Sequence, residues 1–181
     1  MPRKEIFNKN ALLERTYDFI KENGIEKMNA RDLCKYIGCS TQPLFRVFGS
    51  MEEFKKELKV YLHNFYDTFI DKIVDKENYL YTISYAYALF SLEESNIFKA
   101  LFMTDLAGTR TIKEVLESSH NIETIKSIPI QYKITEEEAN NLYRDIRFYT
   151  HGLSCQIACK TISVSKKEIG ELIQNQINKL V

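Results

Sequence analysis

Residues 29–48 have the sequence NARDLCKYIGCSTQPLFRVF, from which the structure of the N-terminal part of the chain can be predicted. It holds two short amphipathic segments separated by Gly38, a residue type that takes the left-handed backbone angles of a tight turn. Asn29 and Ser40 precede the two segments, and both are residue types that cap helix N-termini. Apolar residues at helical spacing would lock the segments together: Leu33, Cys34, Ile37, Leu44, Phe45 and Phe48. The stretch therefore predicts a helix-turn-helix.

Helical patterns continue on both sides of this motif. An apolar helix precedes it and ends at Gly24, and Ser50-Met51-Glu52-Glu53 is a capping box that begins a long helix, expected over 51–76. Further helices are predicted at about 79–93, 96–104, 110–125, 136–161 and 166–180, the last two beginning with capping boxes at Thr135 and Ser165. Residues 127–134, with Pro129, are expected to form a loop. No run of alternating strand residues occurs, so the chain is predicted to be all-α with about nine helices.

Composition narrows the class of protein. The 181 residues have no net charge, but residues 1–60 hold 12 Lys and Arg against 9 Asp and Glu, so the front of the chain is mildly basic. The four cysteines show neither a CxxC motif nor zinc-ligand spacing, so we expect free thiols, no metal site and no cofactor. No signal peptide or membrane-spanning run is present, which favours a cytoplasmic protein without membrane contacts.

The N-terminal part resembles the DNA-binding domain of the TetR/AcrR family over residues 11–58. The resemblance is carried by Gly24, Arg31-Asp32-Leu33-Cys34, Ile37-Gly38-Cys39-Ser40, Leu44-Phe45-Arg46-Val47-Phe48 and Ser50-Met51-Glu52-Glu53-Phe54. It implies a three-helix DNA-binding domain over residues 1–50. It also implies a helical effector-binding and dimerisation domain over residues 51–181. The expected partners are double-stranded operator DNA, a small-molecule effector and a second copy of the chain.

The resemblance makes 41–48 the recognition helix, whose first residues meet base edges in the major groove. Gln42 can pair with adenine, and the methyl group of Thr41 can pack on thymine. Arg46 follows Gln42 by four residues and shares its helix face. Further candidate DNA contacts are Arg31, Ser40, Phe45, Lys55 and Lys56, with Arg3 and Lys4 in the N-terminal arm. The chain departs from the family pattern at Pro43, Phe45, Val47 and Met51, which removes residues that commonly reach phosphate.

Aromatic residues are abundant after the motif, with eleven Tyr and eleven Phe in the whole chain. They predict a mostly apolar effector pocket and favour an apolar or aromatic effector over a charged one. The candidate lining residues are Phe65, Phe69, Tyr81, Tyr85, Phe102, Met103, Phe148 and Tyr149. The last two helices are expected to form the dimer interface through Gly152, Leu153, Ile157, Leu172, Ile173 and Ile177.

The expected function is that of a repressor that an effector releases from a palindromic operator, and the sequence offers three alternatives to it. An enzyme is disfavoured because His63, His120 and His151 stand in separate segments without any nucleophile or phosphate-binding motif, so no catalytic residue is assigned. A redox-sensing regulator would use Cys155 and Cys159, which are neighbours on one helix face. A helical adaptor would use the helix-turn-helix for protein contacts, and loss of salt-dependent DNA binding in Arg46→Ala would argue against it.

Overall fold

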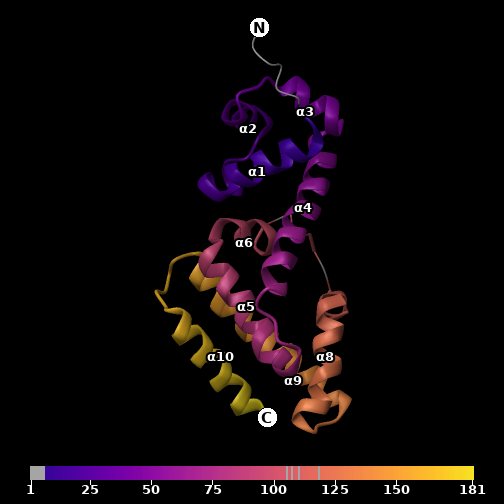
Figure 1. Cartoon of the computed structure of the whole chain (residues 1–181), viewed down its shortest axis with the longest axis vertical. Coiled ribbons are helices and arrows are strands. Elements are labelled where there is room, and N and C mark those ends of the chain that lie inside the picture. Colours follow the sequence, from indigo (N-terminus) through magenta and orange to yellow (C-terminus); the bar gives the residue numbers. More distant parts are fainter. Residues whose placement is uncertain (1–6, 105, 107, 110, 118) are drawn as a thin grey trace. The chain divides into compact units, whose positions relative to one another are not determined.

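The computed structural model describes residues 7–181 except 105, 107, 110 and 118, and every regular element of this described part is helical (Figure 1). The α-helices are α1 (Lys9–Asn23), α2 (Ala30–Ile37), α3 (Thr41–Phe48), α4 (Met51–Asp71), α5 (Tyr79–Glu93), α6 (Ser95–Phe102), α7 (Ile112–Leu116), α8 (Ser119–Tyr132), α9 (Glu136–Ala158) and α10 (Lys166–Leu180). Two 3-10 helices, η1 (Ile25–Lys27) and η2 (Lys76–Asn78), precede α2 and α5. The predicted all-α class is confirmed. None of the described helices is long and apolar enough to cross a bilayer.

The chain divides into two compact units, of which the first comprises the described residues up to Phe65 and those from Asn96 to 107. Helices α1, α2 and α3 pack on one another. Each helix buries a leucine almost completely in this core: Leu12, Leu33 and Leu44. The Asn96 side chain donates a hydrogen bond to the backbone carbonyl of Lys21 at 2.9 Å, which attaches the start of α6 to α1. This unit holds the predicted helix-turn-helix.

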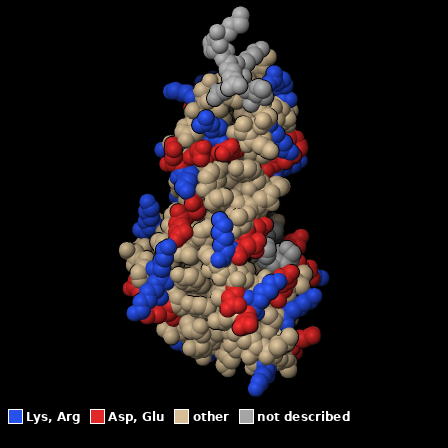
Figure 2. Space-filling view, in the orientation of Figure 1, with Lys and Arg blue, Asp and Glu red and all other residues tan. Residues whose placement is uncertain are grey.

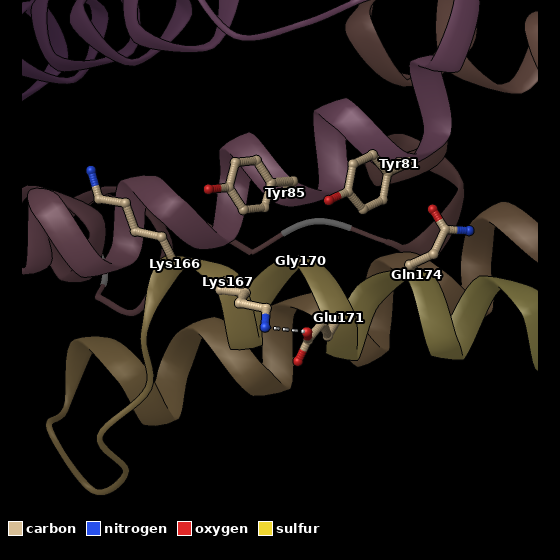
Figure 3. Close-up of a pocket in the computed structure, with 7 residues that line it drawn as sticks. All are labelled: Tyr81, Tyr85, Lys166, Lys167, Gly170, Glu171 and Gln174. Carbon is tan, nitrogen blue, oxygen red and sulfur yellow. Dashed lines mark ion pairs between the residues drawn. The ribbon is translucent and has the colours of Figure 1, made fainter.

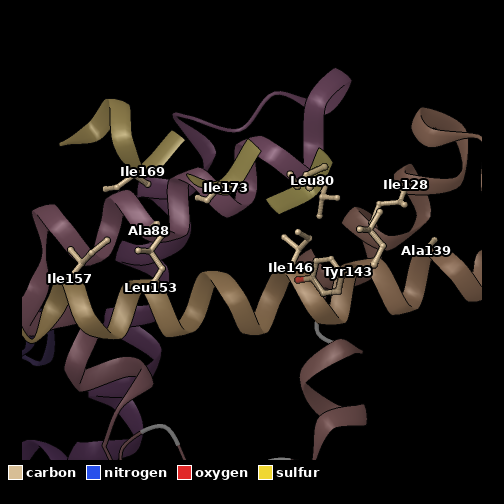
Figure 4. Packing of buried hydrophobic residues seen from close by; sticks show 12 residues of the cluster. Leu80, Ala88, Ile128, Ala139, Tyr143, Ile146, Leu153, Ile157, Ile169 and Ile173 are labelled. Carbon is tan, nitrogen blue, oxygen red and sulfur yellow. The ribbon is translucent and has the colours of Figure 1, made fainter. Parts of the chain in front are cut away.

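The second unit comprises residues 66–95 and the described residues from 108 to 181. Helix α5 lies at its centre and packs against α8, α9 and α10. Every residue from Tyr79 to Leu92 is buried or half-buried, and this stretch carries no charged side chain. Figure 4 shows the core cluster, in which Leu80 and Ala88 of α5 meet Ile146 and Leu153 of α9. Burial of this apolar surface is the main force that holds the unit together.

The predicted loop at 127–134 is wrong, because α8 continues through Pro129 to Tyr132. Proline inside a helix removes one backbone hydrogen bond and normally disfavours the conformation. Here Ile128 is fully buried in the core cluster, with Ile125 and Tyr132 packed against it. The burial of these side chains outweighs the unfavourable effect of proline on the helix. A prediction from turn-forming residues alone does not include this burial.

Helix beginnings were predicted better than helix ends. The capping boxes at Thr135 and Ser165 are both present, each with a backbone amide bound to the hydroxyl and a glutamate returning to the capping residue. Helix α4 ends at Asp71 instead of residue 76. The amide of Ile73 donates to the carbonyl of Ile70 at 2.9 Å, three residues earlier instead of four, so the α-helical pattern is interrupted there.

Candidate functional site

The turn between α2 and α3 is built as the sequence predicts. Asn29 caps α2, its side-chain oxygen accepting hydrogen bonds from the amides of Arg31 and Asp32 at 3.1 and 2.9 Å. Gly38 takes the left-handed conformation (φ 83°, ψ 29°) that ends α2. The amide of Cys39 then donates to the carbonyl of Cys34 at 2.9 Å and closes the turn. The direction of α3 is therefore set by backbone geometry and by its buried anchors.

Ser40 does not cap α3 with its side chain, contrary to expectation. A serine cap usually receives a hydrogen bond from the second or third amide of the helix. The third helical position here is Pro43, which has no amide hydrogen. The Ser40 hydroxyl makes no hydrogen bond with any described residue, and the residue is exposed. It is therefore available to a partner such as a phosphate.

The outer face of α3 carries the predicted base-reading residues. Leu44 and Phe48 are buried and anchor the helix, whereas Gln42, Phe45 and Arg46 are exposed and Thr41 is half-buried. Within the described part of the chain, the side chains of Gln42 and Arg46 have neither a hydrogen-bond nor an ion-pair partner. Two unoccupied polar groups thus project from one face of a rigidly mounted helix, which is the arrangement that base recognition needs.

The predicted phosphate contacts differ in their surroundings. Arg31 is exposed, whereas the Lys56 ammonium pairs with Glu53 at 2.7 Å and with Glu52 at 3.5 Å. The hydrogen bond to Glu53 and the charge of that residue raise the pKa of Lys56. Lys55 lines a small pocket of about 140 Å³ with Ile25, Glu26, Met28, Thr104 and Leu106. Arg3 and Lys4 lie outside the described residues. On the face shown in Figure 2, lysine and arginine side chains are interspersed with acidic ones and form no continuous basic patch.

A groove on the second unit brings together two of the predicted effector residues. The rings of Tyr81 and Tyr85 in α5 stack at 6.0 Å and 14°, and they face α10 (Figure 3). The groove has a volume of about 470 Å³ and is lined in addition by Lys166, Lys167, Gly170, Glu171 and Gln174. Gly170 allows this approach, because a Cβ atom there would stand 2.8 Å from the Tyr81 hydroxyl. The sequence indicated the two tyrosines but not the α10 wall.

The other six candidates are not lining residues of this groove. In the first unit, Phe65 packs on Tyr17 at 4.7 Å, Phe102 packs on Phe98 at 5.1 Å, and Met103 is exposed. In the second unit, Phe69 packs on Phe90, Tyr149 is half-buried and Phe148 is exposed. The aromatic residues of the prediction are thus shared between two compact units and several packing roles.

The predicted interface residues fall into two groups. Leu153, Ile157, Ile173 and Ile177 lie in the core cluster of the single chain, where α9 and α10 meet α5. They can support an interface from beneath, but they offer almost no surface to a second chain. Gly152 and Leu172 are exposed, and so is Phe148 one turn before Gly152. Of the predicted interface residues, only Gly152 and Leu172 are exposed enough to contact a second chain.

A polar cluster around Arg147 of α9 was missed by the sequence analysis. The guanidinium carbon lies 4.4 Å from the ring centroid of Tyr87, and the Tyr87 hydroxyl lies 2.9 Å from Nδ1 of His151. The other ring nitrogen of His151 lies 3.5 Å from the Cys155 sulfur. Burial and the neighbouring Arg147 lower the pKa of His151, so its ring is neutral at pH 7. Tyr143, one turn before Arg147, donates to Asn121 at 2.5 Å.

Cysteine geometry bears on the redox alternative. All four cysteines are free, and Cys34 is buried in the first unit, where burial raises the pKa of its thiol to about 11. Burial also raises the pKa of Cys155, whereas Cys159 is exposed. A raised pKa keeps the reactive thiolate scarce. Among the described residues, no group of three or more His, Cys, Asp or Glu side chains could hold a metal ion.

Comparison with known proteins connects this architecture to a fold. No protein-family model and no curated protein matches the chain. Solved structures do match: one described as a TetR-family transcriptional regulator from Rhodococcus sp. superimposes with a TM-score of 0.70 at 15% identity, covering 94% of this chain and 97% of the other. A TetR transcriptional regulator from Rhodococcus sp. RHA1 superimposes with a TM-score of 0.56 at 13% identity, covering 99% and 98%. The chain therefore has the TetR-type fold that the sequence resemblance implied.

Proposed function

We propose that this chain is a DNA-binding transcriptional regulator of the TetR type, which reads operator DNA through α3 and is not an enzyme. The observation that carries the proposal is the outer face of α3, where Gln42 and Arg46 are exposed and have no partner among the described residues. The leucine and phenylalanine beneath them hold that face in place. The fold shared with two structures described as transcriptional regulators supports the same conclusion.

The proposal is tested by selecting operator sequences from a random pool of duplex DNA with the purified protein. The selection is then repeated with Gln42→Ala and Arg46→Ala. We expect a palindromic site whose base preference relaxes at particular positions in each variant, at a cost of about 1–3 kcal/mol for each lost base contact. Arg144→Ala is the matched control, since Arg144 is a partly exposed arginine of the second unit that pairs with Asp145. Failure to enrich any sequence at any salt concentration would refute the proposal and favour the helical adaptor.

The regulator is proposed to act as a homodimer, because two recognition helices are needed for the two halves of a palindrome. The exposed apolar surface of α9 and α10 supports an interface there: Phe148 is 52% exposed, Leu172 38% and Leu180 42%. Phe148 was expected to contact the effector, and its exposure is better explained by contact with a second chain. Domain roles are kept as predicted, with residues 1–50 binding DNA and residues 51–181 binding effector and partner.

Light scattering of a charge-inserting variant tests the interface. Phe148→Glu places a charge on the proposed contact surface and should give monomers at concentrations where the wild type is dimeric. Val60→Glu is the control, because Val60 is a similarly exposed apolar residue, 57% exposed, on α4. Dimers of unchanged stability in Phe148→Glu would move the interface elsewhere.

Effector control is the third part of the proposal. Binding of a small molecule in the second unit is proposed to shift α4, which belongs to both units, and to lower operator affinity. The coupling free energy of such systems is typically about 1–3 kcal/mol. Repression in the absence of effector is the predicted default. Release from DNA by an oxidant that requires Cys155 and Cys159 would favour the redox-sensing alternative, whereas unchanged release after Cys→Ser at both positions would exclude it.

A further inference from the structure

Three buried polar atoms lack any hydrogen-bond partner in the described part of the chain, and all three lie on one helix. They are Nη1 of Arg147, Oγ1 of Thr150 and Oγ of Ser154. Positions 147, 150 and 154 recur at intervals of three and four residues, so the three side chains form one stripe along α9. Buried polar groups in native proteins are nearly always hydrogen-bonded, and a cluster of exceptions needs an explanation.

The charge on Arg147 makes the exception more severe. An arginine stays protonated in a protein, and a buried charge without a counter-ion is strongly disfavoured. No described carboxylate forms an ion pair with Arg147. Arg144, one turn earlier, is paired with Asp145 at 2.9 Å and with Asn141 at 3.0 Å. The contrast shows that α9 provides acidic and amide partners for Arg144 but none for Arg147, a half-buried residue whose Nη1 atom is buried.

The aromatic groups around Arg147 do not supply the missing negative charge. The Tyr87 ring accepts the guanidinium over its face, an attraction weaker than that of a counter-ion. Burial raises the pKa of Tyr66 and of Tyr143 far above 10, so both hydroxyls remain neutral at pH 7. The neutral ring of His151 adds no charge either. The cluster is therefore a positive centre surrounded by neutral, largely aromatic side chains.

We propose that Arg147 is the anchor of a binding site for a small organic carboxylate, with Thr150 and Ser154 as supporting hydrogen-bond donors. The planar guanidinium binds a carboxylate through two parallel hydrogen bonds. The hydroxyls of Thr150 and Ser154 continue the polar stripe, while the rings of Tyr66 and Tyr87 suit an apolar or aromatic body. This differs from the uncharged effector expected from the sequence. The role of the carboxylate as effector rests on the proposed function. Its binding at Arg147 is independent of that function.

The site is tested without DNA, by calorimetry and thermal unfolding, using benzoate and hexanoate as carboxylate probes and benzamide and hexanamide as neutral probes of similar shape. A carboxylate at roughly 100 times its Kd should raise Tm by about 5–10 °C, and the amides should not. Arg147→Met should remove the shift and Arg144→Met should keep it. Thr150→Val should weaken carboxylate binding by a factor of about ten. Equal binding of amides, binding that survives in Arg147→Met, or no binding of either carboxylate overturns the proposal.

Stability of the ligand-free protein gives a second and independent readout. If Arg147 is kept for a ligand, Arg147→Met removes a half-buried charge whose buried Nη1 atom has no partner, and the ligand-free variant should melt at or above the wild-type temperature. A large loss of stability, or a variant that does not fold, would show that the protein's own groups hold the guanidinium and would overturn the proposal. Inorganic phosphate is a further probe, and a shift as large as that of benzoate would overturn the assignment to an organic carboxylate. Operator binding is measured in a separate experiment, so the carboxylate-binding result can be interpreted even if the protein does not bind DNA.

Discussion

The coupling between Ser40 and Pro43 at the start of α3 gives a prediction whose magnitude follows from the geometry. Ser40 makes no side-chain cap, and the third position of the helix, one of the two whose amides can bind such a cap, is occupied by proline. Ser40→Ala should therefore leave the free energy of unfolding nearly unchanged. Pro43→Ala restores the amide, and a serine cap of this kind contributes about 1 kcal/mol, with a range of roughly 0.5–2.

The proline itself also matters, because it restricts the unfolded chain. Replacing it at a compatible position forfeits about 0.4–1 kcal/mol, so the gain of the cap in Pro43→Ala is largely cancelled. Each single variant should thus be close to neutral, while Ser40→Ala in the Pro43→Ala background should cost about 1 kcal/mol. The double-mutant coupling energy isolates the latent cap.

Urea unfolding followed by circular dichroism measures all four proteins of this cycle. A cost near 1 kcal/mol for Ser40→Ala in the wild-type background would refute the reasoning, since it would show a cap that the geometry denies. A coupling energy of zero would refute it as well. Operator affinity can be measured on the same proteins. If the free hydroxyl of Ser40 serves a phosphate, Ser40→Ala should weaken DNA binding without weakening the fold.

Two further predictions concern the second unit. Gly170→Ala should gain less than the roughly 1 kcal/mol that alanine contributes over glycine in a helix, because its Cβ would stand 2.8 Å from the Tyr81 hydroxyl. In a Tyr81→Phe background the full gain should appear in thermal unfolding, and an equal gain in both backgrounds would contradict the contact. Backbone and side-chain hydrogen bonds from Thr135 and Ser165 lower the pKa of Glu138 and of Glu168 below 4.5. Because the folded-state pKa values are lowered, the stabilisation is present above pH 4.5 and is lost as the pH falls through them. Replacing both capping residues by alanine should make unfolding less dependent on pH below 4.5, and an unchanged acid transition would show that these boxes do not contribute.

Local signals predicted the first unit well because its geometry depends on short-range chemistry. Gly38 and the spacing of Leu33, Leu44 and Phe48 define the helix-turn-helix without reference to the rest of the chain. Asn29 caps α2 as its residue type suggests. Where a local signal conflicted with burial, burial prevailed, as at Pro129.

Sites that join distant segments could not be found in this way. From the sequence of α9 alone, Arg147 would be predicted to be exposed to solvent. In the structure it is shielded by Tyr66 and Tyr87, which lie about 60 to 80 residues earlier in the chain. The groove at Tyr81 likewise depends on Gly170 of α10. The sequence offered one indication of this burial, which is that Arg147 lies at helical spacing from Thr150 and next to Ile146, on the side of α9 that carries Leu153.

The burial of helix α5 determines how its backbone amide hydrogens exchange with solvent. Its residues from Tyr79 to Leu92 are buried or half-buried, and it packs against α8, α9 and α10, so we expect its amides to be freed only when these helices separate from it. Exchange of those amide hydrogens with deuterium should require unfolding of the entire second unit, and they should be the last in the chain to exchange. The exchange rate of α5 therefore reports the global stability of this unit, whereas the amides at the ends of α1 and α10 report only local fraying.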